Sequence, residues 1–309
     1  MSNVEEKLEP GADAERRVLD PILGEIPPDL LKLDAEEDAE DAEKLPTLAE
    51  VGRVLPIGFE DQNGERHRDF ELVEWNWDLE EALGELAENE SEMLLNQYVS
   101  ELIGHGVKRI GSVDFSKLKR SQRRTLVRNL YFADALYLYV WIRIAALGHG
   151  LKFEPFKHCR GKYIERYVGD LRTLEVRTFD EGVPTREVKL EHGVQYAGKR
   201  LTDFTVGPIR WAFMETDDPG QLTNQAKYKK AVLRQGVVGL KGAPEGPVYL
   251  TREHLRSMKP REIDRLVDEI DQSNGGLVME VRDRCPHCKK EFRHPINWRH
   301  DAFFAPSSH

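Results

Sequence analysis

The chain has 309 residues, which is enough to bury a sizeable core in one large or two small domains. Its formal net charge of −10 lies in residues 1–46, which hold 15 acidic and 5 basic side chains, whereas the remaining residues hold 40 of each sign. This distribution argues against a globally basic nucleic-acid-binding protein. We expect residues 1–46 to form an acidic flexible tail, because a stretch such as LDAEEDAEDAEK buries little apolar surface.

The ends of the chain and its longest apolar stretch bear on location. The first residues, MSNVEEKLEP, lack the basic start and apolar run of a secretory signal. The apolar stretch from Ala135 to Leu147 contains Arg143 and is shorter than the ~20 residues that cross a bilayer. We therefore expect a protein made in the cytoplasm, where three cysteines indicate free thiols or metal ligands instead of disulfides.

The first half of the chain predicts a hairpin followed by helices. Residues 54–74 alternate apolar and polar side chains around the turn sequence Gln62-Asn63-Gly64. Helices are expected after Asp78, which can cap one, and then over residues 91–103 and 133–147, the last two ending at glycines.

A basic segment, residues 117–130, lies between the last two of these helices. Such segments are most often solvated helix faces. As an alternative, the segment could bind an acidic partner or hold phosphates, although it lacks the interleaved aromatic residues of a nucleic-acid site. The candidate partner-binding cations are Lys119, Arg120, Arg123 and Arg124.

The second half repeats the order of the first. A strand-rich stretch at 183–211 should turn at Gly193, a helix is expected at 227–235, and GVVGLKG at 236–242 matches GVKRIG at 106–111. The basic segment aligns with residues 254–267, which implies about 11 extra residues in the apolar helix of the first copy. We predict an α+β fold built by internal duplication of a hairpin-helix-helix-hairpin unit. The expected boundaries are residues 1–46, 47–168 and 169–309.

Each copy should end in a zinc-ribbon-like cysteine hairpin. Cys159 follows Leu151 by the same eight residues that separate Cys285 from Leu277. In the second copy the sequence CPHC places two thiols three residues apart, so both can face one ion. In the first copy Lys162 stands where the second cysteine would be.

These cysteines predict one structural zinc site shared by the two copies. A closed site needs four ligands, of which Cys159, Cys285 and Cys288 supply three. His158 is the preferred fourth ligand, and His294 is the alternative. His287, inside the turn, is expected to be solvated. The competing interpretation is that the cation Lys162 marks a half-site that no longer binds metal.

Redox catalysis and other enzymatic chemistry find little support. A redox CPHC motif needs a helix after it, whereas KKEFRHPINW contains Pro295 and alternating aromatic residues. The sequence has no Ser-His-Asp signature and no phosphate-binding glycine loop. We therefore expect no catalytic residues and no cofactor other than zinc.

Three stretches resemble one protein family. DALYLYVWIRIAALG from Asp134, CPHCKKEF from Cys285 and DAFFAPSS from Asp301 resemble the T-even-phage-like baseplate hub assembly chaperones of contractile-tailed phages and related injection systems. The resemblance covers roughly residues 115–308. Lys162 and the acidic extension depart from the usual pattern.

The resemblance implies a non-enzymatic protein that assists assembly of the tail baseplate, as a chaperone or as a component of the virion or injection particle. Its implied partners are the baseplate hub, other tail proteins or a second copy of the chain, met in the cytoplasm of the host or producer cell. The alternative class is a zinc-ribbon nucleic-acid-binding protein, favoured by the basic segment and the cysteines.

The chain ends with two adjacent phenylalanines, Phe303 and Phe304. Burying each is worth about 1.5 to 3 kcal/mol, so we expect something to cover them. They could fold back beside Trp298 or dock into a partner.

Overall fold

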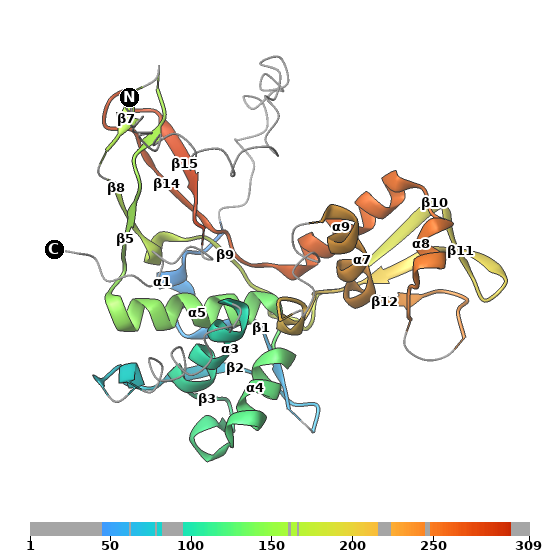
Figure 1. Cartoon of the computed structure of the whole chain (residues 1–309), viewed down its shortest axis with the longest axis horizontal. Coiled ribbons are helices and arrows are strands. Elements are labelled where there is room, and N and C mark those ends of the chain that lie inside the picture. The colour runs from blue at the N-terminus through green and yellow to red at the C-terminus, as the bar shows by residue number, and fades with distance from the viewer. Residues whose placement is uncertain are drawn as a thin grey trace, which may run out of the picture. The chain divides into compact units, whose positions relative to one another are not determined.

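The computed structural model describes residues 45–297, except residues 62, 78, 82–94, 160–161, 166, 216–223 and 245–247. Phe303, Phe304, Trp298 and nearly all of the predicted acidic tail lie outside the described residues. The described fold is mixed α/β with several small antiparallel sheets (Figure 1). No helix in this part of the chain has both the length and the apolar content needed to span a bilayer.

The predicted first hairpin is confirmed. It opens a four-stranded antiparallel sheet with the order β1-β2-β3-β4, and its turn contains Gly64, which has a φ of 78°. The elements of this part are α1 (Leu48–Val51), β1 (Val54–Glu60), β2 (Arg66–Leu72), α3 (Leu95–Gly106), β3 (Val107–Ile110) and β4 (Val113–Asp114).

A second sheet matches the first three strands of this one. It is three-stranded and antiparallel, β10-β11-β12, with a helix between its second and third strands, as α3 lies between β2 and β3. Its elements are β10 (Arg186–Tyr196), β11 (Lys199–Val206), α7 (Gln225–Gly236) and β12 (Val237–Leu240).

The two sheets also share a register. Phe70 pairs with Ile110 in the first sheet, and Phe204 pairs with Leu240 in the second. After one further pair, each ladder skips one residue of the third strand, Lys108 in β3 and Val238 in β12. Beyond this bulge, the N–H of residue 73 donates to the carbonyl of residue 106, and the N–H of residue 207 donates to that of residue 236, both at 2.8 Å.

Two helices follow each sheet. We name β1–β4 with α3, α4 and α5 the first unit, and β10–β12 with α7, α8 and α9 the second unit. The helices are α4 (Arg120–Asn129), α5 (Phe132–Leu147), α8 (Arg252–Arg256) and α9 (Pro260–Asn274), with short 3-10 turns η2 (Phe115–Lys117) and η4 (Trp211–Phe213).

A carboxylate near the start of the last helix ties that helix to the sheet in each unit. Asp134 of α5 accepts hydrogen bonds from the N–H groups of Ile57 and Gly58, at 2.8 and 2.9 Å. Glu262 of α9 accepts from the N–H groups of residues 192 and 193, at 2.6 and 3.5 Å. In both units these N–H groups lie where the ladder register shifts, in β1 and in β10, so they fall outside the regular strand pairs. Each carboxylate therefore accepts hydrogen bonds from N–H groups that the ladder leaves over.

Each unit also packs an isoleucine against a glycine. A Cβ on Gly106 would lie 2.9 Å from Ile142 Cδ1, and a Cβ on Gly236 would lie 2.6 Å from Ile270 Cδ1. Both glycines end the helix that precedes the last long strand. The close approach of α5 or α9 at this point therefore requires the absence of a side chain in each unit.

Two details of the sequence interpretation are wrong. The chain does not turn at Gly193, because β10 continues through it and the turn lies at Ala197 and Gly198, with φ of 49° and 78°. Gly193 uses its φ of 62° inside the strand, where a Cβ would lie 2.0 Å from Leu201 O. Aligning residues 117–130 with residues 254–267 also paired α4 with α9, whereas element order and the buried carboxylates match α5 to α9. The spacing of leucines alone did not distinguish between neighbouring amphipathic helices.

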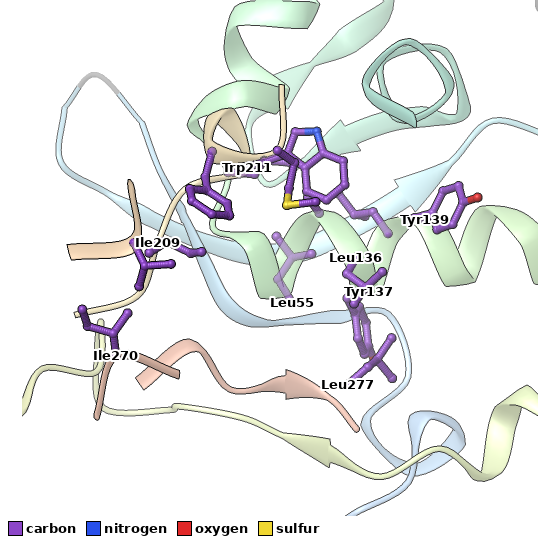
Figure 2. Close-up of a cluster of buried hydrophobic side chains, with 14 of the residues drawn as sticks. Leu55, Leu136, Tyr137, Tyr139, Ile209, Trp211, Ile270 and Leu277 are labelled. Atoms are coloured by element: carbon purple, nitrogen blue, oxygen red, sulfur yellow. The ribbon is translucent and has the colours of Figure 1, made fainter. Parts of the chain in front are cut away.

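One continuous core involves both units, and α5 lies at its centre. Figure 2 shows Trp211 and Ile209, from the segment that links β11 to α7, together with Leu136 of α5. Arg143, only 1% exposed, donates to the carbonyls of Gly148 and Gly150 just after α5 ends. The predicted apolar helix is thus buried, and its arginine is satisfied internally.

The remaining strands form short ribbons. β5 pairs with β8, β6 with β7, β14 with β15 and β9 with β13, all antiparallel. Their bounds, with the short turn η3, are β5 (Gly150–Phe153), β6 (Phe156–Lys157), β7 (Tyr163–Ile164), β8 (Tyr167–Asp170), η3 (Leu171–Thr173), β9 (Val176–Arg177), β13 (Gly276–Leu277), β14 (Glu280–Arg284) and β15 (Glu291–Pro295).

The buried carboxylate of α5 predicts a pH effect on stability. Burial raises the pKa of Asp134 to about 6, against the pull of its two N–H donors. Because the unfolded chain ionises first, near 3.8, stability from this group is present at low pH and falls by up to about 3 kcal/mol as pH rises through about 6. In urea unfolding between pH 4 and 7 with chelator present, wild type should therefore lose stability relative to Asp134→Asn.

Glu262→Gln is the matched control and should show the opposite trend. Burial acts to raise the pKa of Glu262, but the N–H groups of His192 and Gly193 outweigh it and lower the pKa below 4.5. Its contribution is therefore present above pH 4.5 and is lost as pH falls. The same trend for both variants would contradict the assigned balance at Asp134.

Candidate metal centre

The turns of the two cysteine hairpins meet, as predicted. The β14–β15 hairpin carries the CPHC turn, and the β6–β7 hairpin carries Cys159. Lys289 N–H donates to Cys285 O, and Lys162 N–H donates to Cys159 O, both at 2.9 Å. Similar backbone hydrogen bonds therefore close the two turns, and a positive φ of 61° at Lys289 completes the longer one.

Three thiols and one imidazole gather where these turns meet. Cys159 Sγ lies 3.8 Å from Cys285 Sγ, and the ligand atoms of His158, Cys285 and Cys288 all lie within 4.8 Å of one another. Two sulfurs bound tetrahedrally to one zinc at about 2.3 Å would themselves be about 3.8 Å apart. His158, Cys285 and Cys288 are thus close enough to hold a metal ion, and the free thiol of Cys159 adjoins them.

The electrostatic environment differs between the sulfurs. Burial, followed by the neighbouring thiols of Cys285 and Cys288, raises the pKa of Cys159. Burial also acts to raise the pKa of Cys285, but the backbone N–H groups of Cys288 and His287 point at its sulfur and the net effect lowers the pKa. N–H groups aimed at sulfur favour the thiolate, which is the form that binds metal. A dication would also relieve the mutual repulsion of several thiolates.

A small apolar cluster supports the centre. Cys285 is fully buried with Ile164 and Phe292, and Phe156 and Tyr167 pack against this group. The Phe156 and Phe292 rings lie 5.5 Å apart between centroids. Because these residues come from both hairpins, the hairpins have a common core besides their cysteines.

The other candidate residues lie elsewhere. His294, the alternative ligand, stacks on Phe156 with ring centroids 3.9 Å apart, and burial lowers its pKa. His287 is exposed, as expected, and its Nε2 lies 3.3 Å from the carbonyl oxygen of Tyr163. Lys162 is exposed in the shorter turn. The geometry therefore favours His158 over His294 as the fourth ligand.

The basic segment is largely engaged within the chain. Arg120 Nε lies 3.1 Å from Glu101 Oε1, and Arg124 Nη2 lies 3.4 Å from Glu215 Oε2. Arg123 donates to the carbonyl of Gly104 at 3.4 Å. The sequence interpretation treated these cations as available for a partner and missed both carboxylates, which lie 5% and 1% exposed in distant parts of the chain. No local pattern links these acids to α4, so only the fold reveals the pairing.

Comparison of the chain with protein-family models, with curated proteins and with solved structures finds no match.

Metal analysis provides a direct test of the centre. The full chain purified without added metal should contain one equivalent, and Cys285→Ser should lose it, because the thiolate best stabilised by backbone N–H groups is removed. Chelation should lower the melting temperature of wild type, since metal bound only to the folded state adds to its stability. His287→Ala, in the same turn, is the control and should retain the metal.

A rescue variant tests the ligand geometry. Lys162→Cys places a fourth thiol at the position that corresponds to Cys288, so it should restore metal binding to His158→Ala. If His158→Ala retains a full equivalent without the second change, His158 is not a ligand. If neither the wild type nor Lys162→Cys binds metal, the centre is only a thiol cluster.

Proposed function

We propose that this protein is a non-enzymatic assembly protein of the tail baseplate of a contractile phage or injection system, acting as a hub assembly chaperone or structural component. It acts through protein–protein contacts, in the cytoplasm of the producing cell and, if retained, in the particle. The observation that carries this proposal is a candidate metal centre whose ligands all come from the protein. Such a closed centre supplies no coordination position for a substrate and serves to hold two hairpins together.

The metal that we propose is zinc. Three thiolates and one imidazole are a common ligand set of structural zinc sites, and hard cations prefer oxygen ligands. The separation of 3.8 Å between Cys159 Sγ and Cys285 Sγ suits this ion. In this proposal, zinc crosslinks the two zinc-ribbon-like hairpins.

We also propose that the two units arose by internal duplication. The support is the shared strand order, the bulge at the same place in each ladder and the carboxylate near the start of the last helix. In this proposal the repeats are residues 47–168 and 169–309, each ending in a cysteine hairpin. The second cysteine of the first hairpin has become Lys162.

The resemblance to hub assembly chaperones involves two described stretches. Asp134–Gly148 forms α5 with its end, and Cys285–Phe292 forms the turn that contributes two of the proposed metal ligands. Both stretches maintain the fold, so they support the family proposal through its architecture and not through a reaction. The third stretch, Asp301–Ser308, lies outside the described residues.

A second candidate function has one observation in its favour. Exposed cations surround the cysteine turns, as a zinc-ribbon nucleic-acid-binding protein would require. Acidic residues such as Asp283 and Glu291 are interspersed among them, which weakens this candidate. The exposed cations are Lys157, Lys162, Arg284, Lys289, Lys290 and Arg293.

A binding experiment distinguishes the two candidates. The full chain should co-purify at moderate salt with the baseplate hub protein of the same phage or injection system, and the association should survive removal of nucleic acid by nuclease. Binding to DNA or RNA whose affinity falls steeply between 50 and 200 mM salt, without hub binding, would contradict the assembly proposal and favour the alternative. Mass spectrometry of purified particles then decides between a transient chaperone and a retained component.

A further inference from the structure

The segment between β11 and α7 fills a groove of the first unit. Trp211 is fully buried there, and its Nε1 donates to Ser100 Oγ of α3 at 2.7 Å. Glu215 Oε2 lies 3.4 Å from Arg124 and 3.6 Å from Arg128, both on α4. An indole and a carboxylate four residues apart thus anchor one segment to α3 and α4.

The corresponding groove of the second unit is open. A hollow of about 560 Å³ lies where α7, α8 and the start of α9 meet. Figure 1 shows these helices grouped beside the sheet β10-β11-β12. Leu255 and Ile263, both partly buried, provide an apolar surface, and Arg252 and Arg256 line the same hollow. It has the composition of a site for an apolar segment that carries negative charge.

The two arginines of the open groove occupy the same positions as those of the filled one. Asp134 and Glu262 identify equivalent points of α5 and α9. Arg124 precedes Asp134 by ten residues, as Arg252 precedes Glu262. Arg128 and Arg256 likewise precede these carboxylates by six residues. Neither Arg252 nor Arg256 forms an ion pair within the part of the chain that the structure describes.

A segment equivalent to residues 207–215 follows β2 in the first unit. The N–H groups of Val73 and Gly207 make the same hydrogen bond at the end of the matched ladders. Trp77 lies four residues after Val73, as Trp211 does after Gly207. The two tryptophans thus occupy equivalent positions, but Trp211 is fully buried whereas Trp77 is 72% exposed.

The same segment repeats the carboxylate. Glu81 follows Trp77 by four residues, as Glu215 follows Trp211, and Glu81 is exposed. Between the indole and the carboxylate, Leu79 is buried in the core, as Phe213 is. Leu79 therefore anchors the segment to the first unit, while the indole of Trp77 and the carboxylate of Glu81 remain exposed for contact with another molecule.

We propose that Trp77 and Glu81 of one copy insert into the open groove of a second copy, with the indole against Leu255 and the carboxylate between Arg252 and Arg256. The contact reproduces between molecules what Trp211 and Glu215 make within one. Complementary charge and the filled groove of the first unit identify this occupant. Because the two surfaces differ, the association is heterologous and extends head to tail into a ring or a filament.

Sedimentation velocity of the full chain over a concentration series tests the proposal. Wild type should form species larger than a dimer, whereas Trp77→Ala and the double variant Arg252→Glu/Arg256→Glu should each weaken association by about tenfold or more. These residues are exposed, so the variants should retain the circular dichroism spectrum and melting temperature of wild type. Arg265→Glu, an exposed change on α9 that does not line the hollow, is the matched control and should assemble normally.

Mixing the defective variants tests the head-to-tail geometry. The Trp77→Ala chain retains a competent groove, and the Arg252→Glu/Arg256→Glu chain retains a competent Trp77 segment. An equimolar mixture should therefore form a dimer that cannot extend. Adding Glu81→Arg to Arg252→Glu/Arg256→Glu should restore association through the reversed charges.

Two outcomes overturn the proposal. A wild-type chain that remains monomeric at its highest attainable concentration excludes the contact between copies. Loss of assembly in Arg252→Glu/Arg256→Glu but not in Trp77→Ala shows that another segment fills the groove. A photoreactive phenylalanine analogue at position 77 provides an independent readout, because its crosslinks should map to α7 or α8 of a second copy.

Discussion

The insertion of Trp211 against α3 is the interaction on which the arrangement of the two units depends. The indole removes a large apolar surface from water and satisfies its N–H at Ser100, while Glu215 satisfies arginines of α4. Burial of this kind stabilises only if every polar group finds a partner, and here the carboxylate, the hydroxyl and the indole N–H satisfy one another. The segment that connects the second sheet to its helix is therefore also part of the core of the first unit.

Much of the local structure could be predicted from the sequence. The hairpin around Gly64, the helix before Gly236 and the buried helix that contains Arg143 have strong periodicity or glycine signals, and all three are present. The turn assigned to Gly193 was wrong because a glycine with positive φ suits a bulge as well as a turn, and the actual turn also has a glycine, Gly198, so residue type alone did not distinguish the two positions. Periodicity therefore located elements better than it located their connections.

The candidate metal site was more predictable than the ion pairs. Cysteines that form no disulfides serve mainly as free thiols or metal ligands. The equal spacing of Cys159 and Cys285 after matched leucines was therefore sufficient to predict that the two hairpins meet. The pairing of Arg124 with Glu215 has no such signal, because acidic residues are abundant and 91 residues separate the two partners. The partners of Asp134 were equally hard to predict. Its hydrogen bonds to the N–H groups of Ile57 and Gly58 can be inferred only once the irregularity in β1 is known.

The wide spacing of the proposed metal ligands has a consequence during synthesis. Cys159 and Cys285 are far apart in the chain, yet their sulfurs lie side by side in the fold. At ~5 to 20 residues per second, the ribosome releases the second cysteine roughly 6 to 25 seconds after the first. During that interval the shorter hairpin has only two of the four proposed ligands, too few to close the centre. Under the zinc proposal, the centre therefore forms only after the β14–β15 hairpin has been made, so a bound ion would distinguish chains that contain both hairpins from shorter nascent ones.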